Sequence, residues 1–219
     1  MKKIILLAMM VVMGLQSQAQ IVSSRTSMTT TTKVASEPRS GWQTFGLEYI
    51  PSKFDFNKES ESFSTLSLLW TKATSVSSQM PLFIEYGIGG QYSWWSKDDY
   101  EIKYVSVKVP INLVYDFQIP ESNITLDPFI GIKFRGNIWG ELKAPSYSYG
   151  SYTKKTTETY DLFDKDEGDW KRFQIGWNIG LKARFNNSFY VGLSYGSDFN
   201  DIGEDTKIKE TTLSVGLVF

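Results

Sequence analysis

Hydrophobic and polar residues alternate along much of this chain, and the alternation is clearest between Phe173 and Phe185. One set of positions there carries apolar side chains, and the set between them carries Gln, Gly, Asn, Lys and Arg. A β-strand, with its period of two residues, places these sets on opposite faces, whereas a helix would mix them. The pattern therefore predicts a strand whose two faces meet different environments.

Eight segments share this alternation, and turn residues separate them. The pair Asn186-Asn187 tolerates left-handed backbone and predicts a tight turn. Pro110 lies inside one segment and predicts a bulge, because proline cannot donate a hydrogen bond to the neighbouring strand; a functional kink is the alternative. An even number of antiparallel strands can close into a barrel with both termini on one side. The predicted strands lie near residues 42–50, 63–71, 82–94, 105–117, 130–138, 173–185, 189–195 and 213–219.

The alternation alone does not decide which face meets lipid, because a soluble lipocalin-like barrel turns its apolar face inward. Two features favour an outward apolar face. The polar face is rich in glycine, which indicates a crowded interior of the size that eight strands enclose. The apolar face carries aromatic residues near the strand ends, as the aromatic girdles of membrane barrels do. We therefore predict an all-β protein, an eight-stranded antiparallel up-and-down transmembrane β-barrel.

The connections between strands also alternate in length. With the N-terminus in the periplasm, the inner turns are short and the outer loops longer, which is typical of bacterial outer-membrane barrels. The inner turns are predicted near 73–80, 118–124 and 186–187, and the outer loops near 51–62, 95–101, 140–169 and 197–207. The outer loop 140–169 is rich in charge and contains Tyr147, Tyr149, Tyr152 and Tyr160.

With the polar face inward, the barrel interior receives nearly balanced numbers of acidic and basic residues. Isolated charges in a narrow interior are costly, whereas hydrogen-bonded pairs are tolerated. We predict an ion-pair network that plugs the interior; a selective ion path is the alternative. The network residues are Glu48, Glu85, Lys108, Asp116, Lys133, Arg135, Lys182, Arg184 and Glu210.

The N-terminal segments differ from the rest of the chain. Residues 1–19 combine a basic start, a short apolar stretch and a small-residue cleavage site at Ser17-Gln18-Ala19, which predicts a secretory signal peptide. A retained membrane anchor is the alternative, although the apolar stretch is shorter than the ~20 residues of a spanning helix. Residues 20–41 are rich in Ser and Thr and predict a flexible periplasmic leader, or alternatively a glycosylated stalk. The barrel then covers residues 42–219.

The amino-acid composition limits the kinds of reaction and binding site that this protein can support. The net charge of −1 gives no basic field for nucleic acid. The chain has no histidine and no cysteine, which excludes disulfides, Ser-His-Asp and Cys-His nucleophiles and histidine-bearing metal sites. We expect no enzymatic activity and no cofactor. A weak candidate for a calcium site is the acidic cluster of Asp161, Asp164, Asp166, Glu167 and Asp169, for which a solvated loop is the alternative.

The segment ETTLSVGLVF, residues 210–219, looks like the terminal strand of bacterial outer-membrane proteins. Together with VKVPINLVYDF (107–117), DPFIGIKFRGNIWG (127–140) and IGLKARFNNSFYVGLSYGSDFNDI (179–202), it resembles the Bacteroidota-type outer-membrane β-barrel domain family, whose members are also called porin-family or PorT-like proteins. The resemblance implies a Gram-negative outer membrane location, contact with lipid and lipopolysaccharide, and Phe219 as a signal for the barrel assembly machinery. It supplies no catalytic residue.

These observations predict a non-enzymatic barrel with a structural or surface-interaction role, in which the Tyr-rich loop contacts an extracellular or periplasmic protein. A narrow porin-like channel for small solutes or ions is one alternative. An accessory role in outer-membrane secretion is another, suggested by the PorT-like resemblance.

Overall fold

The computed structural model describes residues 41–219 except 57–58, 78–79, 148–154, 165–169 and 204–205. The predicted signal peptide and nearly all of the predicted leader lie outside the described residues. No helix in the described part of the chain is long and apolar enough to cross a membrane. The strands are β1 (Trp42–Phe56), β2 (Glu59–Ser75), β3 (Leu82–Lys97), β4 (Tyr100–Tyr115), β5 (Phe117–Gln118), β6 (Ile124–Tyr147), β7 (Lys155–Asp161), β8 (Phe173–Phe185), β9 (Phe189–Asp198) and β10 (Lys207–Val218).

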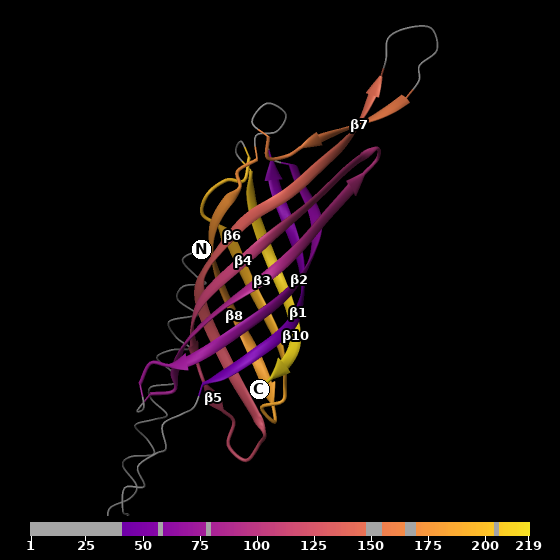
Figure 1. Cartoon of the computed structure of the whole chain (residues 1–219). Coiled ribbons are helices and arrows are strands. Elements are labelled where there is room, and N and C mark those ends of the chain that lie inside the picture. The colour runs from indigo at the N-terminus through magenta and orange to yellow at the C-terminus, as the bar shows by residue number, and fades with distance from the viewer. Residues whose placement is uncertain (1–40, 57–58, 78–79, 148–154, 165–169, 204–205) are drawn as a thin grey trace, which may run out of the picture. The chain divides into compact units, whose positions relative to one another are not determined.

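Eight of these strands form one closed antiparallel sheet. The order runs β4-β3-β2-β1-β10-β9-β8-β6, and pairing of β4 with β6 closes the barrel, as Figure 1 shows. The closed sheet confirms the predicted fold class. β5 pairs with the start of β6, and β7 pairs with its end, so both lie outside the closed ring. Backbone hydrogen bonds between Gln43 and Phe219 join the first and last strands at what we call the inner end.

The two faces of the sheet are sorted as predicted. On β10, Leu213, Val215 and Leu217 are 50–62% exposed on the outside. On β8, Lys182 and Arg184 point inward and are only 8% and 5% exposed. Water-soluble proteins bury their apolar side chains and expose the polar ones, which is the reverse of this arrangement. The outer surface of the barrel therefore suits contact with lipid.

Several predicted outer loops are wrong, because the strands continue through them. Residues 51–56 belong to β1, residues 95–97 to β3, and β6 runs on to Tyr147. The reason lies in a reversed pattern at the outer end, where inward positions are apolar, such as Phe54 and Phe63, and outward positions are polar. The hydrophobic period that identifies a lipid-facing strand therefore does not mark these extensions.

The predicted bulge at Pro110 is also wrong. Pro110 keeps its register opposite Lys133 of β6, and the register towards β3 is the same before and after it. The pairing with β3 omits Pro110, so the missing N–H donor is accommodated without an inserted residue. The register shift of this ladder occurs instead where Val105 pairs with Trp139 and Ser106 with Asn137. It leaves Ile138 as the extra residue, so Ile138 and Trp139 both face outward.

Candidate functional site

The interior of the barrel carries the candidate site, and its outer end is covered by apolar side chains. We call this group the outer cluster: Phe54, Phe63, Tyr104, Leu162, Phe163, Ile202 and Ile208, with Trp170 packed against it. The Trp170 ring lies 5.5 Å from the Phe54 ring and 5.7 Å from the Tyr104 ring. Backbone bonds from Trp170 to Leu162 and from Lys171 to Ile202 hold the segments after β7 and β9 across the barrel end.

Directly beneath the outer cluster lies a buried group of four charges. Lys133 and Arg135 occupy successive inward positions of β6, and both donate hydrogen bonds to Glu210 of β10. Arg135 Nη1 also lies 3.3 Å from Asp198 Oδ2, and Lys133 Nζ lies 3.7 Å from Asp198 Oδ1. All four side chains are at most 8% exposed. Two cations thus meet two carboxylates in a group without net charge.

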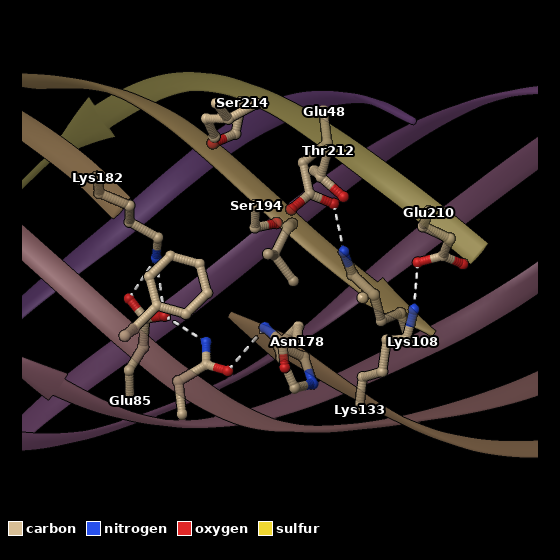
Figure 2. A pocket seen from close by; sticks show the side chains of 16 residues that line it. Glu48, Glu85, Lys108, Lys133, Asn178, Lys182, Ser194, Glu210, Thr212 and Ser214 are labelled. Carbon is tan, nitrogen blue, oxygen red and sulfur yellow. Dashed lines mark hydrogen bonds and ion pairs between the residues drawn. The ribbon is translucent and has the colours of Figure 1, made fainter. Parts of the chain in front are cut away.

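Two further ion pairs cross the middle of the interior (Figure 2). Lys108 Nζ of β4 lies 2.5 Å from Glu48 Oε2 of β1. Lys182 Nζ of β8 donates to both oxygens of Glu85 of β3, at 2.7 and 2.6 Å. Glu85 also accepts hydrogen bonds from Asn112 Nδ2 at 2.9 Å and Thr71 Oγ1 at 3.1 Å. A buried carboxylate with four donated bonds is well compensated for its loss of water.

At the inner end, Arg184 binds two carboxylates. Its Nε lies 2.5 Å from Asp127 Oδ2, and its Nη2 lies 2.5 Å from Asp116 Oδ1. The guanidinium carbon is 3.7 Å from the centre of the Trp42 ring, which adds a cation–π contact. Trp42 belongs to an inner cluster of buried residues: Trp42, Ala73, Phe83, Val114, Phe129, Tyr190 and Val218. The ion pairs therefore lie between two apolar clusters.

Glycine makes room for a large side chain in this interior. Tyr190 of β9 is 1% exposed, and its ring lies inside the barrel over the next two strands, β10 and β1. A Cβ atom at Gly46 would lie 2.1 Å from the Tyr190 hydroxyl, and one at Gly216 would lie 2.7 Å from the Tyr190 ring. Both distances are too short for any side chain, so these glycines allow the Tyr190 ring to fill the space.

The remaining space is small. A cavity of about 40 Å³ lies among Glu48, Glu85, Lys108, Lys133 and Glu210 and their neighbours (Figure 2). That volume admits about three water molecules. The polar groups around it could bind water or a small ion.

All nine charged residues of the predicted network lie in the interior, as their ion pairs describe. Sequence reasoning missed two acidic members, Asp127 and Asp198. The predicted strand 130–138 begins after Asp127, and the predicted strand 189–195 ends before Asp198, so neither residue was assigned to a strand. Counting by two from Gly131 back to Asp127, and from Gly192 on to Asp198, would have placed both on the inward face.

The structure describes only part of the predicted calcium site and of the Tyr-rich loop. Asp166, Glu167 and Asp169 of the acidic cluster lie outside the described residues, as do Tyr149 and Tyr152. Asp161 Oδ1 accepts a hydrogen bond from the Phe163 amide at 2.9 Å. Within the described ranges, no group of three or more acidic side chains could hold a metal ion. Phe219 is 64% exposed beyond β10.

Comparison with known families decides what kind of barrel this is. Residues 5–219 match the family described as outer membrane protein beta-barrel domain. The chain belongs to this family. It is an outer-membrane β-barrel protein of a Gram-negative bacterium, and its outward face is in contact with membrane lipid. A comparison with curated proteins finds no match.

Several solved outer-membrane barrels are similar to this one. Ail, the attachment invasion locus protein of Yersinia pestis, has a TM-score of 0.48 and 12% identity, covering 83% of this chain and 100% of Ail. Neisserial surface protein A has a TM-score of 0.44 and 12% identity, covering 82% and 98%. The outer membrane enzyme PagL has a TM-score of 0.45 and 14% identity, covering 78% and 97%.

Proposed function

We propose that this protein is a non-enzymatic outer-membrane barrel whose interior is plugged and whose outer hairpin contacts another protein. The observation that carries the first part is the filling of the interior by ion pairs between two apolar clusters, around a cavity of about 40 Å³. Open aqueous channels occur in barrels of about 16 strands or more. The absence of histidine and cysteine from the sequence supports a role without catalysis.

Planar-bilayer recording tests the plug. We expect no single-channel steps from the folded protein, because Arg135, Glu210 and the outer cluster block the path that ions would take through the barrel interior. Reproducible steps that disappear in the Lys133→Gln or Arg135→Gln variant would contradict the plug and favour a narrow porin-like channel. The variant Glu101→Gln, which changes an exposed carboxylate on the outside, serves as the control.

The hairpin of β6 and β7 is the proposed contact region. β7 pairs with β6 alone among the described strands, and the hairpin lies beyond the closed ring (Figure 1). Leu162 and Phe163, directly after β7, are buried in the outer cluster and anchor its base. On β7 itself, Tyr160 donates a hydrogen bond of 2.6 Å to Glu158. Tyrosine supplies contact area at low conformational cost, which suits a protein partner outside the cell.

Trypsin treatment of intact cells tests the exposure of this hairpin. We expect cleavage between residues 143 and 155, which include Lys143, Lys154 and Lys155. A hairpin that stays intact while other surface proteins are cleaved would contradict the proposal. Loss of cell-surface binding in a variant that lacks residues 146–157 would identify the hairpin as the contact region.

The final strand supports a second, separate proposal about assembly. Phe219 continues the outward row of Leu213, Val215 and Leu217 and is itself exposed. We propose that this row is read by the barrel assembly machinery, as its resemblance to other terminal strands implies. The PorT-like resemblance would further give the protein an accessory role in secretion, which a secretion defect after deletion would support.

A further inference from the structure

The strand β7 has one edge that no described strand covers. Among the described strands, β7 pairs with β6 alone, over residues 155–161. The next strand in the sequence, β8, pairs with β6 closer to the membrane, from Phe173 opposite Gly136 onwards. As far as the described strands go, the far edge of β7 is open. An open edge presents backbone N–H and C=O groups on which a strand from another molecule can pair.

The pairing with β6 fixes which residues of β7 point to the open edge. The Leu162 amide donates a hydrogen bond of 3.2 Å to the Gly140 carbonyl oxygen, so this pair is of the hydrogen-bonded kind. Hydrogen-bonded and non-hydrogen-bonded pairs alternate along an antiparallel ladder. Counting back from Leu162, Thr159 and Thr157 belong to the other kind, so their N–H and C=O groups point away from β6.

The opposite edge of the hairpin is blocked by a proline. Beyond Lys143, the last residue that pairs with β4, β6 continues to Tyr147. Pro145 occupies the position of this extension that faces away from β7, and it lacks the N–H that a further strand would need. β7 contains no proline between Lys155 and Asp161, and its threonines and tyrosine favour strands. An added strand is therefore expected on β7 and not on β6.

The sequence of β7 suits a second copy of the same strand. Two copies that pair antiparallel about a two-fold axis use one edge twice, and each hydrogen-bonded pair exchanges two bonds. With Glu158 opposite its own copy, like charges would face each other directly, which destabilises a sheet. With Thr159 on the axis, Glu158 of each copy lies opposite Tyr160 of the other. The Tyr160 hydroxyl donates a hydrogen bond of 2.6 Å to Glu158 within one chain, so this register brings a matching donor and acceptor together between chains.

We propose that β7 pairs antiparallel with β7 of a second copy in a facing membrane, with Thr159 opposite Thr159. This inference rests on the proposed contact role of the β6–β7 hairpin and names its partner. β7 runs from the hairpin tip back towards the barrel (Figure 1), so an antiparallel β7 belongs to a barrel that points the opposite way. Copies in one outer membrane all point the same way. The pairing therefore joins barrels of neighbouring cells into one continuous sheet.

Clustering of proteoliposomes tests the pairing with the full folded chain. Phosphatidylcholine vesicles that carry the wild type should grow in mean diameter on dynamic light scattering, whereas empty vesicles should not. Thr159→Pro removes an N–H that points away from β6, so the hairpin keeps its own bonds. Loss of the two bonds at this pair, at about a factor of five each, weakens the pairing about thirty-fold and should abolish clustering at the wild-type density. The matched control, Thr159→Ala, keeps the N–H and should cluster like the wild type.

Disulfide trapping tests the register and the facing arrangement. The chain contains no cysteine, so Thr159→Cys provides a single thiol. The two Cα atoms of a hydrogen-bonded pair lie about 5.5 Å apart, which a disulfide can span. Two vesicle populations are mixed and oxidised, one of them carrying a longer, tagged form of the chain, and dimers of tagged with untagged chains should form. Thr157→Cys, which lies opposite Asp161 in this register, should give much less dimer. Cleavage of the hairpin by external trypsin verifies that it lies outside the vesicles.

The outcomes separate this pairing from the proposed contact role. Clustering of the Thr159→Pro vesicles equal to the wild type, or equal trapping at positions 157 and 159, would overturn the pairing along β7. Dimers that form only within one vesicle population would overturn the facing arrangement. Wild-type vesicles that stay dispersed would also overturn the inference, while loss of cell-surface binding in the variant that lacks residues 146–157 would leave the proposed function standing with a different partner. Failure of both measurements would remove both proposals.

Discussion

Neutralising Glu85 should destabilise the barrel strongly, and the structure allows the size of the effect to be worked out. Glu85 is 1% exposed and accepts bonds from Lys182, Asn112 and Thr71. The variant Glu85→Gln leaves the Lys182 ammonium buried without its carboxylate. Breaking a buried pair in this way costs about 3–5 kcal/mol. Removing both charges, with Lys182→Gln in addition, should cost clearly less than either single change.

The measurement is a double-mutant cycle on urea unfolding of the chain in phosphatidylcholine vesicles, with folded and unfolded forms separated by gel mobility. We expect a coupling energy of about 2 kcal/mol or more between positions 85 and 182. The matched control is Glu101→Gln, which removes a partly exposed carboxylate that contacts Lys103 and Lys143 on the outer surface and should leave the unfolding midpoint unchanged. Additive effects of the two single changes, or a wild-type midpoint for Glu85→Gln, would refute the role given to this ion pair.

Four further changes probe other parts of the structure. Gly46→Ala should cost about 1–3 kcal/mol through overpacking against Tyr190, and Tyr190→Phe should recover part of this cost in the same urea assay. Trp170→Ala should speed tryptic cleavage near the outer cluster without moving the unfolding midpoint, because the segment it anchors can open locally; an unchanged cleavage rate would contradict this. Deleting Ile138 should remove the bulge and leave Trp139 facing outward, because Asn137, Trp139 and Gly140 then alternate in, out and in; loss of indole quenching by a lipid-soluble quencher would contradict this. Phe219→Ala should lower the amount of folded protein in cells yet leave refolding into detergent unchanged, and an equal loss in both would count against an assembly signal.

The sequence predicts the membrane-spanning part of this fold well, because lipid imposes a strict period of two on outward positions. Within the spanning part, every inward charge follows from the same count, as Lys182 and Arg184 show. Outside the lipid the rule fails, since outward residues meet water and inward ones, such as Phe54 and Tyr104, are apolar. The strand extensions and the outer cluster could therefore not be predicted from hydrophobic alternation.

The pairing of acidic with basic residues was harder to predict than the strand face on which each charged residue lies. Which acid meets which base depends on strand tilt and register around the closed barrel, and a single sequence does not contain that offset. The bulge at Ile138 shows the difficulty. It shifts the parity of β6 by one residue, so Gly140 faces inward and meets Phe163, while Asn137 on the other side of the bulge also faces inward.

The ion pairs across the interior join residues that lie far apart in the sequence. Glu48 and Lys108 are 60 residues apart, Lys133 and Glu210 are 77 apart, and Glu85 and Lys182 are 97 apart. The carboxylate that neutralises Lys133 and Arg135 most directly comes from β10, which pairs with β1 and so joins the two ends of the sequence within the ring. An incompletely closed or misordered sheet would leave these cations unpaired, so the interior favours the correct strand order and couples barrel closure to charge neutralisation.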